Sequence, residues 1–247
     1  MIVEYHRPET LQAALELLSR KNPRTLPLGG GTHLSHYRGE PIAVVDLHNL
    51  GLGKVERTGN SLKIGAAATL QDVVNFEDTP SMFKELVRFE TNYNLRQSAT
   101  AAGTLVSGDG KSPFICGLLA LDAFLVLEPG GKEVTVENWL GNRSENRAIA
   151  LITTLVIPLD TVLKYDFVGR SPVDIPIVSV TIGKWTSGRT RVVIGGFGAY
   201  PVLAMDGTDL SKVDYSIKNA CSQLHPTNNS EYILEIAKTL AGRLVGK

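Results

Sequence analysis

The 247-residue chain is predicted to fold as a mixed α+β protein. Helical and strand-like segments alternate along it without a regular strand–helix–strand repeat, which argues against a doubly wound parallel sheet. Hydrophobic residues make up 43% of the chain and charged residues 20%, so it can bury the core of one large or two modest domains. A short, polar segment led by Pro158 predicts a domain boundary near residues 158–166.

The first part of the chain predicts one amphipathic helix and several strands. Four apolar residues share a helical face and predict a helix over residues 9–20: Leu11, Ala14, Leu15 and Leu18. Apolar runs predict strands at residues 25–28, 42–47, 54–58 and 61–64. The last two flank Gly59-Asn60, which suits a hairpin turn. Thr69 and Asp72 form a capping-box pattern for a short helix that ends at Asn75.

The remaining two thirds alternate in the same way. Helices are predicted at residues 80–89, 113–123, 211–223 and 230–245. Strands are predicted at residues 124–127, 133–136, 148–157, 175–182 and 189–194. Residues 96–112 are rich in glycine, serine and threonine and are expected to form a loop.

Charge and composition exclude several classes of protein. The 25 basic and 25 acidic residues cancel, so the chain lacks the basic excess of a general nucleic-acid binder. Cys116 and Cys221 are too few to hold zinc or an iron–sulfur cluster, and we expect two reduced thiols. The chain contains no apolar run of the length that a membrane span needs, and its first residues lack the apolar segment of a signal peptide. A cytoplasmic protein without a membrane span is therefore expected.

Two stretches of small residues could approach a phosphate group closely. The first is Leu28-Gly29-Gly30-Gly31-Thr32-His33-Leu34, and the second runs from Ala99 to Gly110. Glycine allows consecutive backbone N–H groups to turn toward one point, and threonine and serine hydroxyls add donors. Two such turns facing each other could neutralise a diphosphate without a lysine. On glycine content alone, a tight strand-to-helix turn and a flexible surface loop are the more common explanation, because glycine clusters usually mark turns.

Known nucleotide motifs do not account for these stretches. Gly29-x-Gly31 is followed by Leu34 where a Rossmann fingerprint needs glycine. Gly110-Lys111-Ser112 resembles the end of a P-loop, but Leu105 stands where its first glycine belongs. No carboxylate or nucleophile is spaced in the sequence so that it could act together with His33 or His36. We therefore predict no catalytic residue and no metal site.

The order of the motifs resembles the FAD-binding medium subunit of the molybdenum hydroxylases, including carbon monoxide dehydrogenase and the flavin domain of xanthine dehydrogenase. Tyr5-His6-Arg7-Pro8-Glu9-Thr10-Leu11 is similar to the opening of that family, and residues 28–34 are similar to its "A-G-G-T-D-L" loop. Residues 44–47 and 62–69 resemble its "L-I-D-L" and "L-x-I-G-A-x-x-T" segments. Residues 96–105 resemble "R-N-x-A-T-I-G-G-N-L", and residues 118–123 match "L-L-A-L-D-A".

The resemblance implies a fold and a role. The fold is a two-subdomain FAD-binding domain of the PCMH type over residues 1–160, with subdomains at about 1–53 and 54–160, followed by a smaller α+β domain over residues 161–247. The implied role is a noncovalent FAD electron relay. The molybdenum cofactor would lie on a large partner subunit and 2Fe-2S clusters on a small one, with NAD or a quinone as possible acceptor.

The resemblance also assigns cofactor-binding residues. The first loop supplies Leu28, Gly29, Gly30, Gly31, Thr32, His33 and Leu34. The second supplies Thr100, Ala101, Ala102, Gly103 and Thr104. Ser107 and Asp109 align with the ribose and adenine side, Ile157 with an apolar position beside the flavin, and Lys164 and Tyr165 with a position near the isoalloxazine.

Three departures from the family pattern keep two alternatives open. Ala102 replaces a glycine, Thr104 replaces asparagine or aspartate, and Pro113 replaces a final carboxylate. One alternative is a scaffold subunit that keeps the fold and has lost the flavin. The other is a stand-alone flavin oxidase related to the vanillyl-alcohol group, which the lack of room for a substrate domain disfavours.

Overall fold

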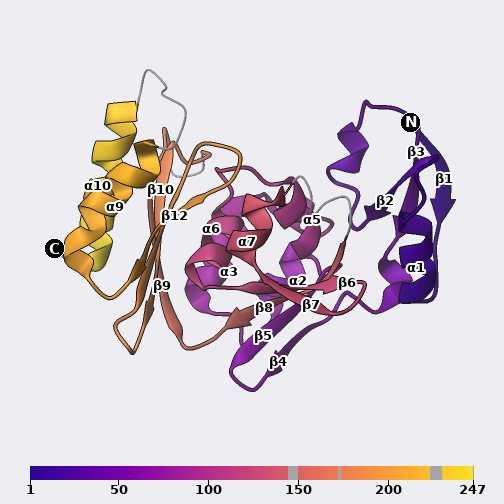
Figure 1. The fold of residues 1–247 in the computed structure, drawn as a ribbon, viewed down its shortest axis with the longest axis horizontal. Coiled ribbons are helices and arrows are strands. Elements are labelled where there is room, and N and C mark those ends of the chain that lie inside the picture. The colour runs from indigo at the N-terminus through magenta and orange to yellow at the C-terminus, as the bar shows by residue number, and fades with distance from the viewer. Residues whose placement is uncertain (144–149, 172–173, 223–229, 247) are drawn as a thin grey trace. The chain divides into compact units, whose positions relative to one another are not determined.

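The chain divides into two compact units in a computed structural model that describes residues 1–143, 150–171, 174–222 and 230–246 (Figure 1). Unit 1 comprises Met1–Thr79, Thr91–Ser107 and Phe124–Ile157. Unit 2 comprises Pro80–Glu90, Gly108–Ala123 and Pro158–Lys247. Two segments from the first 160 residues, Pro80–Glu90 and Gly108–Ala123, thus belong to unit 2.

Unit 1 begins with a small parallel sheet. Its strands are β1 (Ile2–His6), β2 (Arg24–Leu28) and β3 (Ile42–Asp46), in the order β1-β3-β2. The central strand β3 is buried from Ile42 to Val45, as its continuous apolar run requires. Helix α1 (Leu11–Leu18) is capped by the Thr10 hydroxyl, which accepts from the Ala13 N–H at 3.3 Å, and it buries Ala14.

A five-stranded sheet forms the rest of unit 1 together with short helices. The strands are β4 (Val55–Thr58), β5 (Ser61–Gly65), β6 (Phe124–Glu128), β7 (Lys132–Thr135) and β8 (Leu151–Pro158), in the order β4-β5-β8-β6-β7. The helices are α2 (Leu70–Asn75), α4 (Tyr93–Arg96), α5 (Ala101–Ser107) and α7 (Val136–Gly141). The capping box of Thr69 and Asp72 and the hairpin turn at Gly59 are both present, as predicted. Short 3-10 turns follow β2 and β3: η1 (Leu34–His36) and η2 (His48–Leu50).

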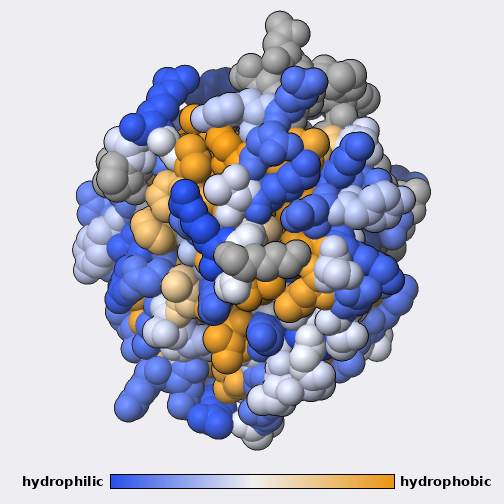
Figure 2. Space-filling view, turned by 90° about the vertical axis from the view of Figure 1, so that its left-hand side faces the viewer, coloured by the Kyte–Doolittle hydropathy of each residue, from blue (hydrophilic) through white to orange (hydrophobic). Residues whose placement is uncertain are grey.

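Unit 2 is built on an antiparallel sheet with helices on both faces. The strands are β9 (Thr161–Val168), β10 (Val178–Trp185), β11 (Thr190–Gly195) and β12 (Val202–Gly207), in the order β12-β11-β10-β9. The turn η3 (Leu210–Lys212) leads into α9 (Val213–Ser222), and α10 (Ser230–Val245) follows. Apolar residues of β10 and β11 pack against α9 and α10 in one core. Figure 2 looks onto this side, where apolar side chains form a band between hydrophilic ones.

The opposite face of this sheet receives α3 (Ser81–Glu90) and α6 (Pro113–Ala120), the two segments contributed from earlier in the chain. Every residue of α6 is buried. Gly183 and Gly195 permit this close packing: a Cβ on Gly195 would lie 2.6 Å from the Cys116 sulfur, and a Cβ on Gly183 would overlap the Ala120 carbonyl. This contact explains why α6 belongs to the same unit as the sheet of β9 to β12.

A charge network joins the end of α6 to β11 and β12. Asp122 adopts a left-handed conformation (φ 53°) and pairs with Arg191, which is 1% exposed, and with Arg189 at 2.8 Å. Arg189 also forms two hydrogen bonds with Asp206, of 2.7 and 2.6 Å. The Arg189 guanidinium holds the pKa of the Asp206 carboxyl below its usual value. Four charges thus compensate one another at this junction.

A buried acid links α3 to α6. The Glu90 carboxylate accepts from the Ser112 hydroxyl at 2.7 Å and from the Phe114 N–H at 3.0 Å. Burial raises the pKa of Glu90 above its ordinary value. The nearby Cys116 thiol is also buried, and desolvation raises its pKa to about 12. The described Cys116 and Cys221 are both free thiols, as expected.

The secondary structure differs from the sequence-based expectation in several places. The segment 158–166, where a boundary is expected and where unit 2 resumes at Pro158, is not a polar linker but largely strand β9, which pairs along its length with β10. Strands β1 and β12 and the short helices α4 and α7 were not anticipated. Residues 101–107 of the expected loop form helix α5. The predicted strand over 148–157 is observed from Leu151, and its residues 148 and 149 lie outside the described ranges.

Among the residues that the structure describes, no helix has both the length and the apolar character of a membrane span.

Candidate cofactor site

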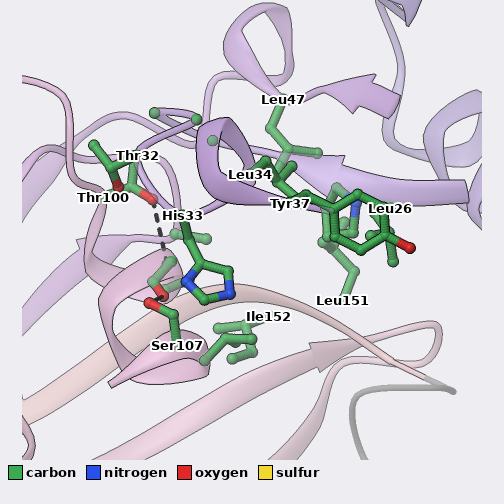
Figure 3. A pocket seen from close by; sticks show the side chains of 18 of the residues that line it. Leu26, Thr32, His33, Leu34, Tyr37, Leu47, Thr100, Ser107, Leu151 and Ile152 are labelled. Atoms are coloured by element: carbon green, nitrogen blue, oxygen red, sulfur yellow. Dashed lines mark hydrogen bonds between the residues drawn. The ribbon is translucent and has the colours of Figure 1, made fainter. Parts of the chain in front are cut away.

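A cavity of about 330 Å³ lies within unit 1 (Figure 3). This volume is at the lower end of the range for ligand sites, so it suits part of a dinucleotide. The loop after β2, helix α5 with the preceding Thr100, and the start of β8 supply most of its lining. The lining residues are Arg24, Leu26, Pro27, Gly29, Gly30, Gly31, Thr32, His33, Leu34, Tyr37, Leu47, Ala66, Thr100, Ala102, Gly103, Val106, Ser107, Trp139, Ala150, Leu151 and Ile152.

The glycine turn at residues 29–31 is required by its close approach to the second stretch. A Cβ on Gly30 would fall at little more than covalent-bond length from the Ser98 carbonyl oxygen. A Cβ on Gly29 would lie 2.7 Å from the Thr100 hydroxyl oxygen, and Gly31 has a positive φ of 70°. The two small-residue stretches therefore meet at one place, as the sequence predicted.

The glycine turn has backbone N–H donors that have no acceptor in the described part of the chain. The N–H groups of residues 29–33 donate no hydrogen bond to any residue in the described part of the chain. Residues 29–33 all line the cavity. A run of backbone N–H groups without internal acceptors can bind an anion, since it needs acceptors from a ligand or from water. The structure thus fits a phosphate group at this turn.

The second stretch corrects the expectation of a second loop of backbone donors. The Ala101 and Ala102 N–H groups donate to the Ala68 and Ala66 carbonyls at 2.9 and 3.1 Å. The Gly103 N–H donates to the Thr100 hydroxyl at 3.3 Å, and the Thr104 N–H to the Thr100 carbonyl at 2.8 Å. These first-turn donors of α5 are used because the carbonyls of Ala66 and Ala68 and the two oxygens of Thr100 accept from them. Instead, the side of α5 that lines the cavity presents hydroxyl groups and the side chain of Ala102 to it.

The cavity has a polar and an apolar side, as Figure 3 shows. Thr32, His33, Thr100 and Ser107 gather at one side, and Leu26, Tyr37, Leu47 and Leu151 at the other. Among the described lining residues, the ionisable side chains are those of Arg24, His33 and Tyr37, and none is a carboxylate. The lining therefore favours an anionic ligand with an apolar part.

Helix α7 supports the wall that α5 forms. Trp139 is 2% exposed and lines the cavity, and the Arg143 guanidinium lies 5.9 Å from the centroid of its ring. Arg143 donates to the Leu105 carbonyl at 3.0 Å and to the Val106 carbonyl. It thereby satisfies carbonyl groups at the C-terminal end of α5 that have no partner within the helix.

The structure brings ten of the seventeen predicted residues to this cavity. They are Gly29, Gly30, Gly31, Thr32, His33, Leu34, Thr100, Ala102, Gly103 and Ser107. Leu28, Ala101 and Thr104 flank them without lining the cavity. Ile157 is fully buried in β8 and does not line it either.

The other three predicted residues belong to unit 2. Asp109 is exposed, and its carboxylate accepts from the Lys111 N–H at 2.8 Å. Lys164 donates to the Leu244 carbonyl at 3.0 Å. Tyr165 stacks with Phe167, with ring centroids 5.6 Å apart, and burial raises its pKa. Their proposed contacts with a flavin stay a prediction.

Sequence reasoning missed most of the apolar lining. Leu26 and Pro27 were assigned only to a strand, while Tyr37, Trp139 and Ile152 carried no motif. Ala66 offered a signal, because it lies in the segment that resembles the family's "L-x-I-G-A-x-x-T". The described residues contain no group of three or more His, Cys, Asp or Glu side chains that could hold a metal ion.

Comparison with known proteins identifies the class of protein. The family model described as the FAD binding domain in molybdopterin dehydrogenase matches residues 1–160, which contain the whole cavity. The chain belongs to this family, as the resemblance implied. A curated relative, the uncharacterized protein YgfM of Escherichia coli K12, is 26% identical over 200 residues, which cover 79% of this chain and 75% of the relative.

Solved structures share the fold of the chain. The crystal structure of quinoline 2-oxidoreductase from Pseudomonas putida 86 matches with a TM-score of 0.80 and 18% identity, over 98% of this chain and 95% of that chain. A Cu,Mo-CO dehydrogenase structure matches with a TM-score of 0.77 and 20% identity, over 98% and 96%. The carbon monoxide dehydrogenase from Hydrogenophaga pseudoflava matches with a TM-score of 0.76 and 16% identity, over 97% and 94%. The predicted α+β flavoprotein-subunit fold is confirmed.

Proposed function

We propose that the chain is the FAD-carrying subunit of a molybdopterin-dependent dehydrogenase or hydroxylase complex. One observation carries the proposal: a glycine turn with five backbone N–H groups lacking acceptors in the described chain lines a cavity without a described carboxylate. Membership of the FAD-binding family makes FAD the ligand that this chemistry best fits.

Residues 29–33 would bind the diphosphate through their N–H groups, and the Thr32 and Thr100 hydroxyls lie beside them as further polar contacts. Leu26, Leu47 and Leu151 would exclude water from the apolar side of the cavity. When bound, FAD supplies the redox chemistry, and the chain supplies binding and orientation. No side chain of this cavity is assigned an acid–base role.

The complex would contain a large subunit with the molybdenum cofactor and a small subunit with 2Fe-2S clusters. The structural relatives include quinoline 2-oxidoreductase and CO dehydrogenases, which supports this assembly. The two cysteines of this chain are too few for a cluster of its own. Electrons would pass through the bound flavin to NAD or a quinone. The free thiols agree with the reducing cytoplasm as its location.

A second candidate is a subunit that keeps the fold without flavin. The helical second stretch favours it, because the Ala101–Thr104 N–H groups are all used internally and the Ala102 side chain lines the cavity. A ligand diphosphate would then be bound by backbone donors from one side only.

Cofactor content separates the two candidates. The chain should be purified alone and together with its partner subunits, and each sample scanned for flavin absorbance. Released cofactor is then identified by chromatography against FAD, FMN and riboflavin. The proposal predicts noncovalent FAD at about one per chain in the complex. Absence of flavin from an intact complex, even after incubation with FAD, would establish the scaffold role instead.

A further inference from the structure

We infer that Asp46 is a positioning residue, which the side chains of Tyr5 and Arg7 hold at the end of β3 and which fixes the place where the glycine turn begins. The inference rests on the proposed function, because it explains how the turn is held ready for a ligand. Tyr5 lies in β1 and Arg7 directly after it, while Asp46 ends β3. Two motifs that no earlier part of the site used, 41 residues apart at Tyr5 and Asp46, thus meet in the fold.

The Asp46 carboxylate has three partners in unit 1. Its Oδ2 accepts a hydrogen bond from the Tyr5 hydroxyl and lies 3.6 Å from the Arg7 Nε. Its Oδ1 accepts from the His48 N–H at 2.9 Å. The Asp46 side chain is 14% exposed and that of Arg7 46% exposed, so the carboxylate is the inner member of this group. These contacts join the end of β1, the end of β3 and the start of η2.

A short series of contacts leads from Asp46 to the glycine turn. Strand β2 lies at the edge of the three-stranded sheet, pairs there with β3, and runs directly into the turn. Its last residue, Leu28, lies opposite Asp46, and the Leu28 carbonyl accepts from the Leu47 N–H at 3.0 Å. The Leu28 side chain lies 3.5 Å from the position of a Cβ on Gly31. The end of β3 therefore determines where the turn starts.

The same carboxylate orients Leu47 toward the cavity. A bond from an aspartate oxygen to the backbone N–H two residues on closes an Asx turn, which fixes the residue between them. That residue is Leu47, which is 5% exposed, lines the apolar side of the cavity and packs with Val45 and Leu151 (Figure 3). Without the carboxylate, the His48 N–H and the Arg7 guanidinium lose this partner. The start of the turn and the apolar wall would then shift together.

A second charged group on β1 provides a matched control. Glu4 accepts from Arg20 at 2.9 Å, and its Oε2 lies 2.8 Å from the His6 ring. These contacts link β1 to the residues after α1, and they involve neither β3 nor the glycine turn. Removing the Glu4 carboxylate should cost little stability, as for other exposed ion pairs, and should leave the turn in place.

The first test is ligand affinity in the full chain. Dissociation constants of FAD and of ADP are measured by titration calorimetry, at a temperature at which circular dichroism shows each variant to be folded. A hydrogen bond to a charged phosphate oxygen contributes about tenfold to affinity, so Asp46→Ala should weaken FAD binding about tenfold. ADP should weaken by the same factor, because both ligands carry the diphosphate. Asp46→Asn keeps an acceptor for the His48 N–H and should recover part of the loss, and Glu4→Ala should bind like wild type.

The second test observes the turn without a ligand. The amide NMR signals of Gly29, Gly30 and Gly31 should shift in Asp46→Ala and stay in place in Glu4→Ala. Tyr5→Phe should shift the same signals in the wild-type background and add nothing in Asp46→Ala, because the hydroxyl acts through the carboxylate.

Wild-type affinity and unshifted glycine signals in folded Asp46→Ala would overturn the inference, as would equal losses of affinity in Asp46→Ala and Glu4→Ala. If Asp46→Ala does not fold, Tyr5→Phe decides, and wild-type affinity and signals in that variant would overturn it. Absence of FAD and ADP binding, in the wild-type chain and in its complex, would remove the proposed function. The glycine signals of the ligand-free chain would still decide whether Asp46 positions the turn.

Discussion

The glycine turn offers the sharpest perturbation, because at Gly30 a single methyl group meets backbone atoms on the opposite side. The Cβ added by Gly30→Ala would overlap the carbonyl of Ser98, whereas real Cβ atoms essentially never come closer than 3.0 Å to such neighbours. The Cβ is fixed by the backbone of residue 30 and the carbonyl belongs to the backbone of Ser98, so no side-chain rotation can relieve the overlap. The two stretches must separate by roughly 1.5 Å, and overpacking of this kind costs about 1–3 kcal/mol.

The consequence for binding follows from the same displacement. N–H groups placed for hydrogen bonds of about 2.9 Å lose most of their strength when they shift by more than an ångström or so. We expect Gly30→Ala to weaken FAD binding at least about tenfold, which corresponds to about 1.4 kcal/mol. The assay combines FAD titration by fluorescence with thermal unfolding by circular dichroism.

Gly53→Ala is the matched control for this experiment. No atom lies within 4 Å of the Cβ that it would add, and the φ of Gly53 is not in the left-handed region. It should leave flavin affinity and melting temperature close to wild type. Wild-type affinity and stability in Gly30→Ala would refute the close approach of the two stretches.

Two further predictions concern unit 2, and urea unfolding measures both. Asp122→Asn should lower the free energy of unfolding by about 3 kcal/mol, because Arg191 is 1% exposed and loses the closer of its two carboxylate partners, Asp122 and Asp206. Asp78→Asn is the control, because it breaks an exposed ion pair with Arg57, and it should lower the free energy of unfolding by less than about 1 kcal/mol. Equal losses of stability in the two variants would contradict the prediction. Burial raises the pKa of Glu90, so its contribution to stability is present at low pH and lost as pH rises through the folded pKa. The free energy of unfolding of Glu90→Gln, measured relative to wild type, should therefore rise by about 1 kcal/mol as the pH is raised from 4 to 7.5. A difference between the two proteins that does not change with pH would contradict this prediction.

The first half of the site could be predicted from sequence because its chemistry is local. A buried strand followed by Gly29-Gly30-Gly31 must turn sharply, and only glycine tolerates the approach that this turn makes. The second half could not be predicted equally well. Ala-Ala-Gly-Thr suits both a loop and the first turn of a helix, and acceptors on Ala66 and Ala68, more than 30 residues away, decide in favour of the helix.

The division into units shows the same limit. Strand β9 was taken for a polar boundary, because its alternation includes Lys164 and Asp166 and follows a proline. Its pairing with β10 depends on residues that lie 10 to 24 positions further along the chain. The transfer of α3 and α6 to unit 2 depends on Gly183 and Gly195, whose missing side chains make room for α6. Sequence patterns reveal the elements, but such small-residue contacts become visible only in the structure.

An experimental structure of the chain with FAD tests the central claim most directly. The account predicts diphosphate oxygens within about 2.7–3.2 Å of backbone nitrogens of residues 29–33, with the ligand occupying the cavity between the glycine turn and α5. A flavin whose diphosphate contacts other residues while residues 29–33 face solvent would contradict it.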